Sequence, residues 1–158
     1  SIFRKKGVWA GDGNNVCNSY VEAAGKFGFN LYFYGPIQNI PHSELISTAK
    51  KSGSDIVITQ NAKEAFDGAD LIVTDTWVSM HDISAKKKIS ALRPYQVDCK
   101  KMSYAKHDSI FLHCLPAHRG HEVVDEVIDG KNSKVFDAAE NRMHVQKAII
   151  KWVLNINF

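Results

Sequence analysis

Five short apolar runs, separated by helical patterns, constrain the fold more than any other feature of this sequence. The runs are VWAG (8–11), NLYFYG (30–35), DIVIT (55–59), DLIVTD (70–75) and SIFLHC (109–114). Their length and nearly continuous apolar character are typical of strands buried on both faces of a parallel sheet. The sequence therefore predicts an α/β fold, with a doubly wound, mainly parallel five-stranded sheet and helices on both faces.

Helical patterns lie between and after these runs. We expect helices over 15–27, 42–51, 61–67, 86–92, 99–106 and 137–156. Gly28 follows the first of them as a stop signal. In the last, apolar residues recur at helical spacing after an acidic first turn, which predicts an amphipathic helix that adds to the core of the domain.

Length, charge and cysteine content narrow the class of protein. The 158 residues are enough for one domain, expected over 1–158, and no apolar stretch reaches the roughly 18 residues that span a membrane. The net charge of +3 is too small to predict a nucleic-acid partner. Three cysteines without a spaced framework favour a reducing, cytoplasmic location. The abrupt opening SIFRKKGVWAG suggests a chain cut from a longer one.

Chemically unusual residues follow three of the expected strands. The exits read GDGNN (11–15), DTWVSM (75–80) and HCLPAHRG (113–120). In open α/β sheets, ligands bind in the crevice beyond the carboxyl ends of the strands. We therefore expect the three exits to converge on one ligand site.

The GDGNN exit resembles a dinucleotide-binding turn only in part. Val16 stands where that pattern needs its third glycine, and no acidic residue ends the second strand. One of Asn14 and Asn15 is expected to cap the following helix. The other asparagine is then left to point toward the crevice.

The DTWVSM exit has residues suited to a zwitterion. Asp75 is expected to take an ammonium group, and Ser79 a carboxylate. The alternative is that Asp75 caps a turn while Trp77 and Met80 belong to the core.

The HCLPAHRG exit combines a thiol with several histidines. Its spacing lacks the two separated ligand pairs of a structural zinc site, so we expect no metal. If Cys114 lies beside cationic groups, we expect its pKa to be lowered and the residue to act as an acid or base. The alternative is that Cys114 is a half-buried structural thiol. The spacing leaves both interpretations open.

Together with AENRMH (139–144), these three motifs resemble the carboxyl-terminal half of the ornithine carbamoyltransferases. The resemblance implies two substrates, L-ornithine and carbamoyl phosphate, and no cofactor. It also implies a partner, the amino-terminal domain that holds carbamoyl phosphate, whose motifs do not occur here. A homotrimer and a role in arginine metabolism are expected of the full-length enzyme.

The resemblance also implies roles for individual residues. Ornithine would be gripped by Asn15, Asp75, Ser79 and Met80. Cys114 and Leu115 would lie beside the carbamoyl group and the attacking δ-amine, and Arg142 would reach carbamoyl phosphate. Cys114 and Arg142 are thus the expected catalytic residues, Cys114 by accepting the proton of the amine or by orienting it.

The expected reaction is carbamoyl transfer to the δ-amine of ornithine, giving L-citrulline and phosphate. Two alternatives stay open. The chain could serve a carbamoyltransferase for another amine, such as putrescine or a modified ornithine. It could also be a non-catalytic domain that binds an amino acid.

Overall fold

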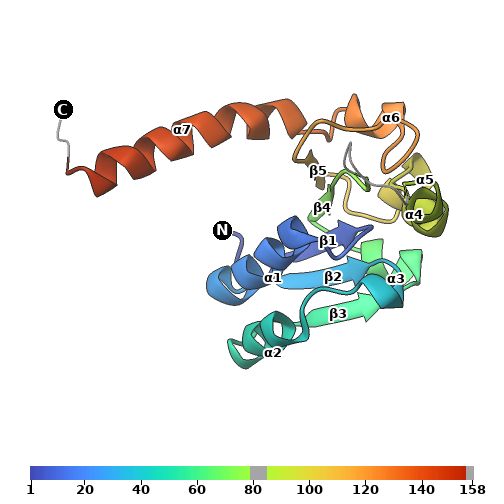
Figure 1. Ribbon diagram of the computed structural model, residues 1–158, viewed down its shortest axis with the longest axis horizontal. Helices are drawn as coiled ribbons and strands as arrows, with labels where there is room; N and C mark the ends of the chain where they lie inside the picture. The colour runs from blue at the N-terminus through green and yellow to red at the C-terminus, as the bar shows by residue number, and fades with distance from the viewer. Residues whose placement is uncertain (79–84, 156–158) are drawn as a thin grey trace.

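The computed structural model describes residues 1–78 and 85–155, which form one sheet with helices packed around it (Figure 1). The strands are β1 (Lys6–Ala10), β2 (Asn30–Tyr34), β3 (Ile56–Thr59), β4 (Leu71–Thr74) and β5 (Ile110–His113). The helices are α1 (Asn15–Phe27), α2 (Ser43–Lys51), α3 (Ala62–Phe66), α4 (Ala85–Leu92), α5 (Cys99–Met102), α6 (Asp125–Ile128) and α7 (Val135–Val153). Two 3₁₀ turns, η1 (Ile37–Asn39) and η2 (Arg93–Tyr95), lie between them. None of the helices in these ranges is long and apolar enough to cross a membrane.

The five strands run parallel in the order β3-β2-β1-β4-β5. The chain builds outward from β1 to β3 on one side, then returns to place β4 on the other side of β1. This reversal makes the β1–β4 junction the topological switch point, where α/β sheets bind their ligands. The predicted doubly wound sheet is confirmed.

Both faces of the sheet are buried at its central strand, each beneath its own helices. Along β1, Val8 and Ala10 join one cluster with α3 and α6, while Trp9 joins the other cluster with α1 and α2. All three side chains are at most 1% exposed. This alternation explains why the strands read as continuous apolar runs.

Helix α1 begins and ends where the sequence predicted. The Asn14 side chain accepts a hydrogen bond from the Cys17 backbone N–H and caps the first turn. Gly28 ends the helix at φ 70°, in the left-handed region that favours glycine. Two local signals therefore fix the helix that leads out of the GDGNN turn.

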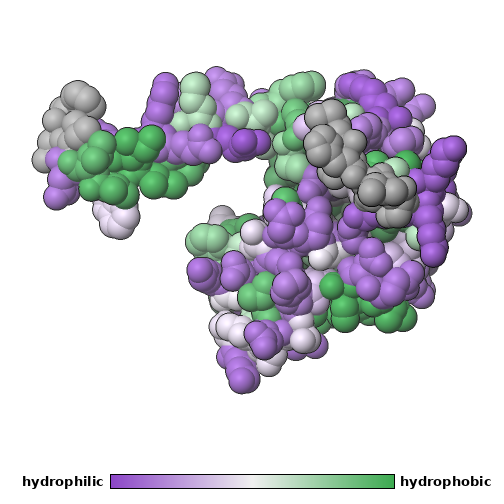
Figure 2. Space-filling model, in the orientation of Figure 1, coloured by the Kyte–Doolittle hydropathy of each residue, from purple (hydrophilic) through white to green (hydrophobic). Residues whose placement is uncertain are grey.

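Helix α7 departs from expectation. It leaves the sheet and extends away from the other elements (Figure 1), and Val135 is its only buried residue. The far end of the helix forms a green patch in Figure 2. The large apolar side chains exposed along the helix are Phe136, Met143, Val145, Ile149, Ile150, Trp152 and Val153. Apart from Val135, which joins the core, the prediction that this helix adds to the core of the described residues is wrong, because most of its apolar face extends beyond the sheet.

Candidate active site

The GDGNN turn is held tightly at the carboxyl end of β1. The Trp9 indole donates to the Asp12 carbonyl oxygen, and the Asp12 carboxylate accepts from Asn39 and pairs with Lys88 at 2.7 Å. A Cβ at Gly13 would lie 2.2 Å from the Asn39 carbonyl oxygen. Only glycine therefore allows the backbone to approach this closely, and the turn is fixed before α1 begins.

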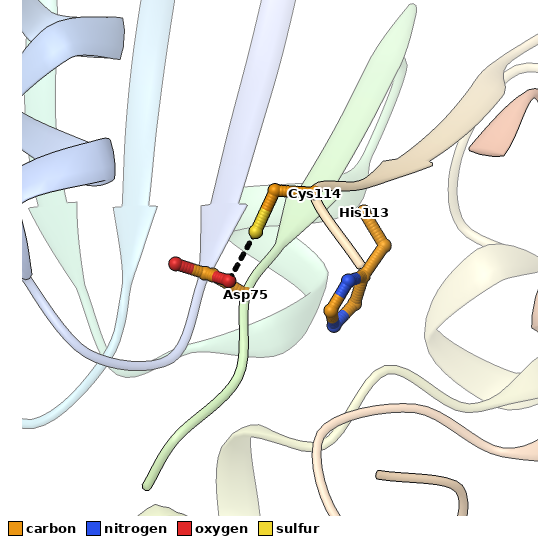
Figure 3. Close-up of side chains that lie close together, drawn as sticks. All are labelled: Asp75, His113 and Cys114. Atoms are coloured by element: carbon orange, nitrogen blue, oxygen red, sulfur yellow. Dashed lines mark hydrogen bonds between the residues drawn. The ribbon is translucent and has the colours of Figure 1, made fainter. Parts of the chain in front are cut away.

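Asp75 lies at the centre of the site, directly after β4 (Figure 3). Its Oδ1 accepts from the Thr76 N–H at 2.7 Å and from the Cys114 thiol. Its Oδ2 accepts from Asn14 Nδ2 at 2.8 Å. The three exits therefore converge on this carboxylate, as the sequence predicted.

One of the two asparagines of the turn caps the helix, as expected, and the same asparagine contacts Asp75. Asn14 caps α1 and contacts Asp75, whereas Asn15 is exposed and its side chain makes no hydrogen bond to the described residues. Asn15 is therefore the asparagine left available to a ligand. The alternative for the DTWVSM segment is that Asp75 caps a turn and that Trp77 belongs to the core. Asp75 accepts a hydrogen bond from the next backbone N–H, and Trp77 is 1% exposed, so the alternative is correct for the tryptophan.

The electrostatic environment of Cys114 is opposite to the one expected from its sequence neighbours. The half-buried thiol donates to Asp75 rather than lying beside a cation. Burial, followed by the hydrogen bond to Asp75 and its negative charge, raises the pKa of Cys114 to about 12. The expectation of a lowered pKa is therefore wrong, and Cys114 is a protonated thiol near neutral pH.

A buried pair missed in the sequence supports the HCLPAHRG turn. Glu122 is fully buried, and its Oε1 lies 3.2 Å from His113 Nε2 and accepts from the His118 N–H at 2.5 Å. His113 Nδ1 accepts from the Leu115 N–H at 2.8 Å, which assigns the imidazole proton to Nε2. Leu115 has φ 53° and precedes Pro116 through a cis peptide bond. The pair thus holds a backbone conformation that leucine rarely adopts.

Asp75, His113 and Cys114 also offer three potential metal-ligand atoms within 4.8 Å of one another. Both nitrogens of His113 are already hydrogen-bonded, one to Leu115 and one to Glu122. The thiol and carboxylate are bonded to each other. Each of the three potential metal ligands thus already has a hydrogen-bond partner in the protein.

Arg142 and Cys114 line the same cavity, of about 180 Å³, between the sheet edge and α7. Arg142 is exposed and has no ion pair with the described residues. Tyr20 of α1 lines the cavity too, and burial, then Cys114 and Asp75, raise its pKa. Cys114 and Arg142, the two expected catalytic residues, thus line one cavity, while Ser79 and Met80 lie outside the described residues.

Comparison with known proteins identifies a family for this chain. Residues 4–153 match the family described as aspartate/ornithine carbamoyltransferase, Asp/Orn binding domain. The ornithine carbamoyltransferase of Ruegeria pomeroyi is 55% identical over 155 residues, covering 97% of this chain and 50% of the relative. That of Roseobacter denitrificans is 51% identical over 157 residues, covering 98% of this chain and 51% of the relative.

Solved structures give the same result. The chain superimposes on ornithine carbamoyltransferase from Pyrococcus furiosus with a TM-score of 0.88 at 40% identity, covering 96% of this chain and 50% of that one. The anabolic enzyme from Campylobacter jejuni gives 0.88 at 35% identity, covering 98% and 52%. The chain spans about half the length of the relatives it matches. It therefore belongs to the aspartate/ornithine carbamoyltransferase family.

Proposed function

We propose that this chain is the ornithine-binding, carboxyl-terminal domain of an ornithine carbamoyltransferase. The enzyme transfers the carbamoyl group of carbamoyl phosphate to the δ-amine of L-ornithine and releases L-citrulline and phosphate. The observation that carries the proposal is the Asp75 carboxylate at the switch point, where residues from three strand exits meet. Membership of the family and the similarity to ornithine carbamoyltransferases support ornithine as the amine.

Ornithine binding is assigned to the crevice around Asp75. A carboxylate has about four acceptor sites, and three on Asp75 are filled by described residues. The fourth takes the ammonium group of the amino-acid end. Asn15, whose side-chain amide has no hydrogen-bond partner among the described residues, binds beside it, and Ser79 and Met80 complete the proposed contacts with ornithine.

Cys114 orients the amine rather than deprotonating it. A thiol whose pKa is raised to about 12 is a poor base at neutral pH, so of the two expected roles the structure favours orientation. Leu115 presents its backbone beside the carbamoyl group from the turn that His113 and Glu122 hold. The attacking amine is thereby aligned with the carbamoyl carbon, which lowers the entropic part of the barrier.

Arg142 contacts carbamoyl phosphate from α7. The leaving phosphate and the developing oxyanion are both negative, so a fixed guanidinium stabilises the transition state. One guanidinium cannot hold so anionic a substrate alone. The amino-terminal domain supplies the remaining anion-binding groups and covers the apolar face of α7, most of which is exposed here. The full-length enzyme is proposed to be a cytoplasmic homotrimer acting in arginine metabolism.

The test is citrulline formation by this chain alone and by this chain joined to the half of the Ruegeria pomeroyi relative that it does not cover. We expect turnover only from the joined enzyme, with ornithine and not putrescine as acceptor. Turnover with putrescine would support a carbamoyltransferase for another amine. Ornithine binding without any turnover in the joined enzyme would support a non-catalytic domain.

A further inference from the structure

The Asn14 side chain makes two hydrogen bonds at once, one through its oxygen and one through its nitrogen. No other asparagine cap among the described residues does so. Its Oδ1 accepts from the Cys17 N–H at 2.9 Å, and its Nδ2 donates to Asp75 Oδ2 at 2.8 Å. A backbone N–H can only donate and an ionised carboxylate can only accept, so the two contacts fix the orientation of the amide. Asn14 thus connects the start of α1 to the end of β4.

We propose that Asn14 is a positioning residue that sets which acceptor site of Asp75 is left for the substrate ammonium group. The inference deepens the proposed function and rests on it. The two donors on Oδ1, the Thr76 N–H and the Cys114 thiol, fill that oxygen. The remaining acceptor site is therefore on Oδ2, beside the Asn14 contact, and Asn14 determines its direction.

The surroundings of Asn14 make this hydrogen bond rigid. Asp12, two residues earlier, is held by Lys88 and Asn39, and the Gly13 N–H donates to the Asn39 carbonyl oxygen at 2.8 Å. Asn14 therefore cannot follow Asp75 if that side chain turns. The carboxylate must adopt the rotamer that meets the amide, and the substrate meets a preorganised acceptor.

The test separates positioning from capping. Asn14→Ser keeps an oxygen that caps α1, because serine is as good an N-cap as asparagine, but its hydroxyl stops one bond short of the amide nitrogen. Asn61→Ser is the matched control. Asn61 caps α3 through the same kind of contact, to the Glu64 N–H, and its side chain does not contact Asp75.

In the joined enzyme described above, we expect Asn14→Ser to raise KM for ornithine about tenfold, as loss of a hydrogen bond to a charged group does. KM for carbamoyl phosphate should stay unchanged, and Asn61→Ser should change neither constant. A merely structural role predicts a smaller active fraction, with lower turnover and both KM values as in the unsubstituted enzyme. That result would overturn the inference.

Calorimetric titration with ornithine separates failure of this inference from failure of the proposed function. If the Asn14→Ser and unsubstituted enzymes bind ornithine equally well, the role of Asn14 alone is overturned. An unsubstituted enzyme that is folded by circular dichroism and binds no ornithine overturns the proposed function and this inference together. Affinity lost in Asn14→Ser and kept in Asn61→Ser supports both.

Discussion

Replacing Asp75 with asparagine removes the proposed ammonium acceptor while keeping nearly the same shape. The three donors that surround Asp75 leave no good orientation for the new amide. Its NH₂ group must face either the Thr76 N–H or the Asn14 amide NH₂, since each carboxylate oxygen accepts from one of them. The substitution therefore removes a charge and also places two donors against each other.

The expected loss of ornithine binding follows from the charge. A hydrogen bond to a charged group contributes about 1.5–3 kcal/mol, which corresponds to a dissociation constant about 10- to 150-fold weaker. Calorimetric titration of the joined enzyme measures this change, and carbamoyl phosphate affinity should be unaffected. The control is Asp98→Asn, since Asp98 caps α5 and pairs with Lys101. Ornithine affinity within twofold of the unsubstituted enzyme would refute the assignment.

Further predictions test Cys114, Gly13 and Arg142. Because the pKa of Cys114 is raised to about 12, iodoacetamide at about pH 8.5 should modify Cys114 more slowly than exposed Cys99, as peptide mass spectrometry would measure. Equal modification rates would contradict the environment described for Cys114. The free energy of unfolding that the protonated thiol contributes should be complete below about pH 9, the ordinary pKa of a thiol, and should be lost as the pH rises toward 12. Gly13→Ala should destabilise the fold by about 1–3 kcal/mol in a thermal melt, whereas Gly7→Ala, whose Cβ would have no contact closer than 3.4 Å, should cost less. Arg142→Lys should raise KM for carbamoyl phosphate and leave ornithine affinity unchanged, because lysine lacks the planar fork that binds a phosphate through two bonds; an unchanged KM would remove Arg142 from the site.

Local signals predicted much of the fold. The 15–27 helix begins and ends as expected because Asn14 and Gly28 mark its ends within the sequence itself. Convergence of the three exits also follows from local information, because the ends of neighbouring parallel strands meet at one edge. The helix expected over 99–106 ends at Met102, and α6 was not predicted, since four-residue helices carry too little periodicity.

Contacts between distant residues could not be predicted in the same way. Cys114 has histidines and an arginine nearby in sequence, yet its partner is Asp75, 39 residues earlier. Glu122 lies in a segment that reads as an exposed loop, and nothing in its neighbours marks it as fully buried beneath His113. The amphipathic pattern of α7 predicts an apolar face but does not say which surface covers it.

Helix α7 is attached to the core through its first turn, so a small change of angle there displaces the far end of the helix. Its 19 residues span about 28 Å, and Arg142 lies about 10 Å from the pivot at Val135. A tilt of about 5° at that pivot moves the far end by about 2 Å and Arg142 by about 1 Å. A misplacement of about 1 Å at a reacting group can lower a rate about a hundredfold. In the proposed role of Arg142, a surface that holds Trp152 and Ile149 at the far end would therefore set the position of the guanidinium through the angle of the whole helix.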